Sequence, residues 1–263
     1  MRTDKKHYSE FTFEGLAELV DWVEQTPRSE TARDESVTTT GQYSSGGKMA
    51  WSRNTDWEGT LNLVKRGWVD GANEIHKLTQ RFVDVQANIT PIDEDEWIAA
   101  DEGECVDVAD YLAGEPECFR VMQTTETEHR VVDLWWRVGA LSNVNGKNTY
   151  DQGVALLAAI DKIEKRGVRC GLTVWSAAQA SGYKYSTAVV VKRPEQRLEM
   201  GNIAFAVAHP AYHRRLLFAL VERQHIKNMP GTTWNGYGRT ITKSSDVPAD
   251  RFPQGALVLS SNS

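Results

Sequence analysis

The sequence of 263 residues is 40% hydrophobic and 25% charged, which is the composition of a globular protein with one large domain or two small ones. No apolar run reaches the ~18 residues of a membrane span, and no apolar segment follows the basic residues of the N-terminus. Neither a membrane protein nor a signal peptide is therefore predicted. Three cysteines without a CxxC pair indicate a reduced, cytoplasmic protein.

The net charge of −6 is unevenly distributed along the chain. Residues 91–129 hold 13 acidic residues and one basic residue, Arg120, a net charge of −12. The remaining chain holds 29 basic and 23 acidic residues, a net charge of +6. This asymmetry is compatible with an acidic face and a basic face on one molecule. The plainer alternative, that the charges pair with each other or are solvated, is equally consistent with the composition.

The first part of the chain is predicted to be a helix followed by an arm. Apolar residues recur at helical spacing before Pro27, so residues 1–35 are assigned to an N-terminal helix. Nine of the twelve residues from 36 to 47 are Ser, Thr or Gly, which indicates a flexible linker. Residues 36–55 also contain aromatic and basic side chains and no acidic one. They are interpreted as a flexible basic-aromatic arm.

A main domain is predicted over residues 56–226. It begins with two helices joined by a tight connection, the first capped by Asp56 and ended by Gly67, the second starting after Gly71. The acidic segment that follows is interpreted as loops with one brief helix, Val108 to Leu112. This helix leads into a strand over residues 118–123.

A strand–helix–strand unit is the best-defined part of the main domain. Its first strand, HRVVDLWWRVGAL, is rich in β-branched and aromatic residues and is expected to pair with the strand before it. Thr149 or Asp151 caps the helix, and VRCGLTVWSA forms the second strand. The unit favours right-handed parallel pairing. A third strand, YKYSTAVVVKR, is followed by helices over residues 198–208 and 210–225.

The C-terminal segment, residues 227–263, is Gly-rich and polar with a last apolar run that predicts a short final strand. The fold class is therefore α/β or α+β, with a mixed β-sheet flanked by helices and an N-terminal helical elaboration. The chain lacks the run of five strands that an OB-fold needs, so an OB-fold is not expected.

Most enzyme and metal-site motifs are missing from the sequence. It has no GxxxxGK[ST] phosphate loop, no GxGxxG dinucleotide loop and no GxSxG nucleophile elbow. His209 and His213 could face one metal ion, but the Glu of an HExxH motif is missing and a helix start explains the pattern better. Asp93, Asp95 and Glu96 could hold a cation, although a solvated acidic surface is the simpler interpretation. No catalytic residue, metal or cofactor is predicted.

The strand–helix–strand unit resembles the von Willebrand A type of fold. VVDLWWRVGAL ends in a loop rich in Ser and Asn and is followed by a helix and a second strand. The DxSxS metal motif expected at the end of the first strand is replaced by GALSNVN. Metal-dependent adhesion is therefore not predicted.

Four segments combine aromatic and basic side chains as single-stranded nucleic acid requires. Aromatic rings stack on bases, at ~1–3 kcal/mol per base, and Lys and Arg displace counterions from phosphates. Each residue also has a structural interpretation, such as a helix staple for Trp57, so the recurrence of the pattern carries the hypothesis. The candidate DNA-contacting residues are Tyr43, Lys48, Trp51, Arg53, Trp57, Lys147, Tyr183, Lys184, Trp234, Tyr237, Arg239 and Lys243, with Tyr150 and Tyr185 beside them.

Three phrases, DWEGTLNLVKRGWVDGANEI, GECVDVADYLAGEPECF and HPAYHRRLLFALVERQ, resemble a family of proteins of tailed bacterial viruses. They lie between Asp56 and Gln224, so the resemblance covers most of the chain. Within that family, the members with a known role that the chain most resembles are the Drc proteins, the single-stranded-DNA-binding RNA polymerase cofactors of podoviruses that carry a giant virion RNA polymerase. The resemblance implies a protein of the host bacterial cytoplasm that holds unwound promoters and recruits the two-subunit phage RNA polymerase. It supplies no individual DNA contact.

The leading hypothesis is a non-enzymatic, single-stranded-DNA-binding transcription cofactor whose partners are single-stranded DNA and the phage RNA polymerase; oligomerisation is left open. The C-terminus, LVLSSNS, lacks the acidic tail that many single-strand binders use to recruit partners, and residues 91–117 are a candidate replacement. The first alternative is a phage protein–protein interaction module, in which the tryptophans are interface anchors and the arm is a linker. The second is an enzyme such as a nuclease that uses Asp93, Asp95 and Glu96 as metal ligands.

Overall fold

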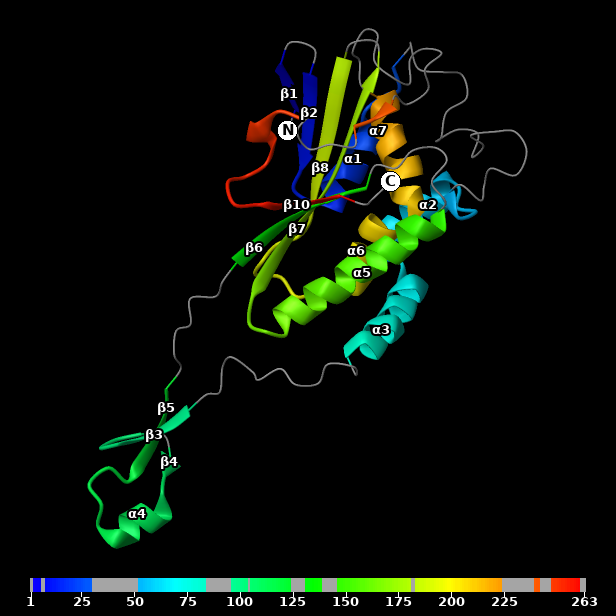
Figure 1. Cartoon of the computed structure of the whole chain (residues 1–263). Helices are drawn as coiled ribbons and strands as arrows, with labels where there is room; N and C mark the ends of the chain where they lie inside the picture. Colours follow the sequence, from blue (N-terminus) through cyan, green and yellow to red (C-terminus); the bar gives the residue numbers. More distant parts are fainter. Residues whose placement is uncertain are drawn as a thin grey trace.

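The computed structural model describes residues 2–5, 8–29, 52–83, 96–103, 105–123, 131–138, 146–180, 183–223, 239–241 and 247–260. These residues form an α/β fold in which helices flank a mixed sheet, as predicted, and a second, small antiparallel sheet (Figure 1).

A seven-stranded mixed sheet forms the centre of the fold. Its strands are β1 (Arg2–Lys5), β2 (Tyr8–Phe13), β6 (Val131–Arg137), β7 (Arg169–Ala180), β8 (Tyr183–Lys192), β9 (Arg239–Thr240) and β10 (Leu257–Ser260). They lie in the order β1–β2–β8–β7–β6–β10, and β9 pairs with the last part of β7. β6 is parallel to β7 and β10, whereas β8 is antiparallel to β7 and parallel to β2.

The predicted parallel strand–helix–strand unit is confirmed. β6 and β7 pair in parallel, with Leu134 opposite Leu172, and helix α5 (Gly146–Glu164) lies between them in the chain. α5 begins earlier than predicted, so Thr149 and Asp151 lie inside the helix and not at its cap. The strand register places successive side chains on opposite faces, which is why Trp135 and Trp136 enter different clusters.

The remaining helices of the main body are α1 (Leu16–Gln25), α2 (Trp57–Arg66), α3 (Val69–Val83), α6 (Met200–Ala208), the π-helix η3 (Tyr212–Leu217) and α7 (Phe218–Glu222). In Figure 1 the helices lie on one side of the sheet and the C-terminal segment, in red, lies on the other. The large core forms on the helical side, with Trp136, Leu157 and Phe205 buried in it. A smaller cluster on the other face packs Trp135 and Trp175 against Phe252.

Local signals fix both ends of α2, as predicted. The Asp56 carboxylate accepts a hydrogen bond from the Gly59 N–H at 2.7 Å, and Gly67 ends the helix with a φ of 73°, a conformation that favours glycine. α3 starts at Val69, three residues before the predicted position, which was after Gly71. α5 and α6 approach so closely at Gly153 that a Cβ on this residue would lie 2.5 Å from the Ala208 Cβ.

The two chain ends also contribute strands to the central sheet. The predicted N-terminal helix is present as α1, but two strands precede it, and β2 pairs in parallel with β8. At the other end, β10 corresponds to the predicted short final strand, and both β9 and β10 join this sheet. The sheet therefore extends beyond the predicted main domain of residues 56–226, because its edges are built from segments far apart in the sequence.

The acidic segment forms a small unit of its own. It contains β3 (Glu96–Ala100), β4 (Cys105–Val106), helix α4 (Val108–Ala113) and β5 (Phe119–Gln123), in the sheet order β3–β5–β4. The predicted brief helix and the strand near residues 118–123 are confirmed, whereas β3 and β4 lie where only loops were expected. The expected pairing of β5 with the following strand, β6, is wrong, because the two belong to different sheets.

Candidate nucleic-acid interface

The carboxyl ends of the parallel strands β6 and β7 define one end of the molecule. α5 leaves β6 toward β7, while β10 lies on the other side of β6, so the strand order reverses at this point. In open α/β sheets the crevice outside such a reversal is the usual place for a ligand. We call this region the basic end, after the cationic residues of the segments at or beside it: Arg137 at the end of β6, Lys147 at the start of α5, Arg53 against Tyr150 of α5, and Lys184 and Arg239 in the strand row described next.

A row of residues crosses the sheet at the basic end. Gln179 on β7 pairs with Lys184 on β8 and with Arg239 on β9, and Lys184 in turn pairs with Tyr8 on β2. Gln179 is four residues beyond the β7 partner of Arg137, or about 13 Å along the strand. Two of the predicted DNA-binding segments thus lie on either side of the same β7 residue, although 55 positions separate Lys184 from Arg239.

A buried arginine of the π-helix η3 holds the end of the predicted arm. The Arg215 guanidinium donates to the Thr55 carbonyl at 3.1 Å and to the Ser52 hydroxyl at 3.4 Å. Ser52 is fully buried, and its own hydroxyl donates to the Thr55 carbonyl at 2.8 Å. The chain therefore enters α2 from a point that is fixed on η3.

Arg53 lies over two aromatic rings beside this turn. Its guanidinium carbon is 4.8 Å from the centre of the Trp68 ring and 5.2 Å from that of Tyr150, and Glu74 pairs with it at 4.0 Å. Tyr150 comes from the first turns of α5, so this contact joins two of the predicted DNA-binding segments. Burial and the neighbouring Glu74 carboxylate raise the pKa of Tyr150 to about 12.

Two further cations, Arg137 and Arg214, are buried in the protein. Arg137, at the end of β6, donates to the Ile241 carbonyl at 3.2 Å, and burial lowers its pKa. Burial also lowers the pKa of Arg214 to about 10. Burial and the positive charges of Arg214 and Arg137 lower the pKa of His213 to about 3, so these three groups lie within electrostatic reach of one another. A cationic cluster in a low-dielectric setting attracts anions strongly.

Nearly the whole chain matches one protein family. Residues 2–261 match the family described as Domain of unknown function (DUF7192). The chain belongs to the DUF7192 family. No curated protein and no solved structure matches it. Because the match spans both sheets, the basic end and the acidic unit are parts of one DUF7192 sequence.

The predicted site residues of this DUF7192 protein fall into three groups. Lys147 is exposed and pairs with Asp151 at 2.6 Å, and Lys184 is half-buried in the row described above. Arg53 and Trp57 also have structural contacts, since Trp57 packs against the large core. Tyr185 is buried, which raises the pKa of its hydroxyl. Outside the described residues or side chains lie Tyr43, Lys48, Trp51, Tyr183, Trp234, Tyr237, the Arg239 side chain and Lys243.

Sequence reasoning missed Arg137, Arg214 and Arg215. Their signal was present, since HRR interrupts an otherwise apolar helical stretch and Arg137 ends an apolar strand. Charged residues at positions where the periodicity requires burial mark either an internal pair or a ligand site. In this DUF7192 protein all three side chains are buried.

The two histidines of HPAYH are structural. His209 is buried with its ring edge-on to Trp68, 4.7 Å between centres, and its Nδ1 accepts a hydrogen bond from the Ala211 N–H at 3.1 Å. Within the described ranges no three His, Cys, Asp or Glu side chains are grouped so that they could hold a metal ion. Asp93 and Asp95 lie outside those ranges, as does the side chain of Glu96. Of the helices that the structure describes, none is both long and apolar enough to cross a membrane.

A cavity of about 700 Å³ lies at the opposite end of the helical layer. Its floor is apolar and its rim carries charged residues from α1, α2 and the segment after β8. Two rim cations are engaged in ion pairs, Arg193 with Glu14 at 2.8 Å and Lys65 with Glu24 at 3.6 Å. The charges around this cavity are largely balanced. The basic end is therefore a stronger candidate than the cavity for binding an anionic ligand.

The stability of the protein is expected to fall between pH 6.5 and 5 because of His209. Burial, with a contribution from the Arg53 charge, lowers the pKa of His209 to about 4, so the ring is neutral when folded and binds a proton on unfolding in this range. The contribution of the neutral His209 ring to the free energy of unfolding is fully present above about pH 6.5. It declines as the pH falls toward 4, and the loss at pH 5 is about 2 kcal/mol. Urea unfolding of wild type and His209→Gln across this range measures it. An equal decline in both proteins would contradict the assignment.

Proposed function

We propose that this DUF7192 protein binds single-stranded DNA at its basic end. The observation that carries the proposal is that segments distant in the sequence meet in two pairs. The end of the arm meets the start of α5 through Arg53 and Tyr150, and the start of β8 meets β9 through Gln179. These four segments are the ones that combine aromatic and basic side chains.

Single-stranded DNA is favoured over duplex DNA because the segments at the basic end combine aromatic and basic side chains. Stacking on aromatic rings needs bases that are free of a partner strand, and it tolerates any base sequence. No long helix carrying a basic face lies at this end among the described elements, so the geometry of a major-groove reader is not evident there. The cations supply the phosphate contacts that make such binding salt-dependent.

The biological role follows from the family resemblance. A resemblance to the Drc family suggests a transcription cofactor in the cytoplasm of an infected bacterium, which holds unwound promoters and recruits the phage RNA polymerase. In this role the protein has no catalytic residues. Tyr43 and Trp51 of the arm then contact bases, while Arg215 and Arg53 fix its end to the body.

A protein–protein interaction module without DNA binding is the second candidate. The acidic unit favours it, because four of its apolar side chains, between Val106 and Leu112, are exposed. The two functions are separable, since the acidic unit and the basic end consist of different residues.

Anisotropy of labelled oligonucleotides at two salt concentrations tests DNA binding, with single-stranded DNA, duplex DNA and RNA compared. Lys147→Ala is expected to weaken single-stranded DNA binding and to reduce the slope of log affinity against log salt by roughly 0.7, the value for one lost phosphate contact. Its pair with Asp151 is exposed, so the fold should not change.

Lys165→Ala is the matched control. Lys165 is also an exposed lysine in an ion pair four residues apart, with the half-buried Asp161 at 2.8 Å, but it lies just beyond the other end of α5. Its removal should leave DNA affinity and the salt slope at the wild-type values. Equal effects of the two substitutions would argue against the basic end as the site, and absence of binding at low salt would leave the interaction module as the function.

A further inference from the structure

Helix α4 of the acidic unit presents an apolar face to solvent. Val108, Tyr111 and Leu112 are 66%, 64% and 78% exposed, and their spacing of three and four residues puts them on one side of the helix. Val106, in the neighbouring strand β4, is exposed as well. Contiguous apolar side chains of this size in solvent mark an interaction site.

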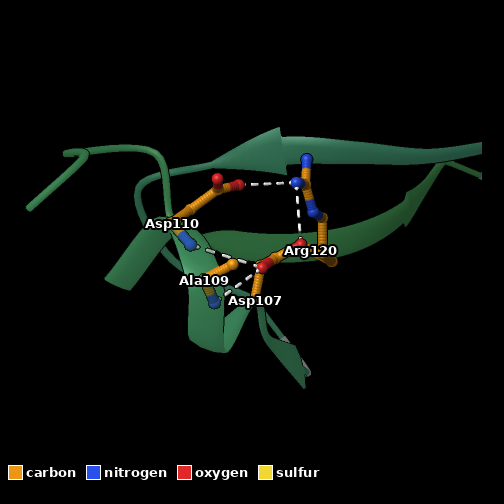
Figure 2. A network of polar contacts seen from close by, with 4 residues as sticks. All are labelled: Asp107, Ala109, Asp110 and Arg120. Atoms are coloured by element: carbon orange, nitrogen blue, oxygen red, sulfur yellow. Dashed lines mark hydrogen bonds and ion pairs between the residues drawn. The ribbon is translucent and has the colours of Figure 1, made fainter. Parts of the chain in front are cut away.

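An ionic network fixes this helix so that the face stays outward (Figure 2). Asp107 caps α4 by accepting hydrogen bonds from the N–H groups of Ala109 and Asp110, at 3.0 and 3.3 Å. The Arg120 guanidinium, from β5, donates to the Asp107 carboxylate at 3.0 Å and to that of Asp110 at 2.6 Å. The Arg120 hydrogen bond lowers the pKa of Asp107. The only basic residue between positions 96 and 123 is thus committed to orienting α4.

The charge around the apolar face restricts what can cover it. Residues 96–123 hold eight acidic residues and one basic residue. Those whose exposure the structure describes, all exposed or half-buried, are Asp101, Glu102, Asp107, Asp110, Glu115 and Glu117. Such a surface repels phosphates, so a nucleic acid cannot be the occupant. An apolar ridge with an acidic surround is complementary to an apolar groove with a rim of Lys and Arg on another protein.

We propose that the α4 face, formed by Val108, Tyr111 and Leu112 and surrounded by carboxylates, docks into a basic-rimmed apolar groove of the phage RNA polymerase. The identity of the partner rests on the proposed function; the chemistry of the groove rests on the acidic unit alone. Because the docking face and the basic end use different residues, one molecule can hold DNA and polymerase together. Recruitment then needs no rearrangement of the DNA-binding surface.

The test uses the full-length protein and the purified two-subunit phage RNA polymerase. Tyr111→Gln/Leu112→Gln removes the ridge while keeping a good helix former at both positions. The double variant is expected to bind the polymerase about tenfold or more weakly, since exposed apolar anchors that become buried dominate such interfaces. Val69→Gln, which replaces a 58% exposed valine in a helix of the main body, is the matched control and should bind as wild type does.

Single-stranded DNA affinity and sedimentation of each variant separate the outcomes. Weaker polymerase binding with unchanged DNA affinity supports the docking face. Equal polymerase affinity of wild type and double variant, or no polymerase binding by wild type, overturns it even if DNA binding holds. Self-association of wild type that the double variant loses overturns it in favour of a second copy of this chain. Polymerase binding without DNA binding supports the docking face and refutes the proposed DNA-binding function.

Discussion

Lys192→Met is expected to lower the free energy of unfolding by about 3–5 kcal/mol, the cost of leaving a buried charge without its partner. The Lys192 side chain is 1% exposed, and its Nζ lies 2.6 Å from a Glu164 carboxylate oxygen. The same ammonium donates to the Cys170 carbonyl at 2.8 Å. Lys192 ends β8, Glu164 ends α5 and Cys170 is the second residue of β7, so one cation joins three elements of the core.

Urea unfolding of four proteins measures the size of this interaction: wild type, Lys192→Met, Glu164→Gln and the double variant. The double variant should be more stable than the sum of the two single losses predicts, because neither charge is then left alone. Lys165→Met removes an exposed lysine next to Glu164 and should cost less than about 1 kcal/mol. A loss from Lys192→Met as small as that of Lys165→Met would show that the buried pair does not stabilise the fold.

The parts of the fold that the sequence predicts are those with local causes. Asp56 and Gly67 bound α2 because a carboxylate can cap a helix and glycine can leave it with a positive φ. VVDLWWR is recognised as a strand because it is rich in β-branched and aromatic residues, which suit a strand that becomes buried over its second half. In each case a few adjacent residues contain the whole signal.

The parts that were missed depend on partners far away in the chain. β2 is a strand of the central sheet because it pairs with β8, which lies about 175 residues later in the sequence. No local sequence pattern identifies β8 as its partner. In the same way, Arg215 is buried because Ser52 and Thr55 meet it. The burial of a charged side chain is decided by the partner that the fold brings to it, and the sequence around HRR contains no sign of Ser52.

The candidate site shows the same division. Residue types predicted the segments, since aromatic rings and cations in Gly- and Ser-rich surroundings are visible in the sequence. Their grouping was not predictable, because it depends on a strand row through Gln179 and on the stacking of Arg53 on Tyr150. The internal role of Arg53 was also hidden, since a stacked, ion-paired arginine and a DNA-contacting one look identical in sequence.

Arg215→Ala is expected to destabilise the protein by about 3 kcal/mol, because it leaves the buried Ser52 hydroxyl and Thr55 carbonyl without their charged donor and removes a buried side-chain stem. Arg215→Lys should recover only part of the loss, since an ammonium cannot match a planar guanidinium that reaches two acceptors. Arg193→Ala, which breaks an exposed pair with Glu14, is the matched control and should cost less than about 1 kcal/mol. Thermal and urea unfolding measure all three variants.

The same variants separate anchoring of the arm from direct contact with DNA. If Arg215 acts by fixing Ser52 and Thr55, Arg215→Ala should weaken single-stranded DNA binding while the salt slope stays close to that of wild type, because no phosphate contact is lost. A slope smaller by roughly 0.7 would instead identify Arg215 as a phosphate ligand. Wild-type stability in Arg215→Ala would contradict both the buried hydrogen bonds and the fixed start of α2, and with them the argument that the arm leaves the body at the basic end.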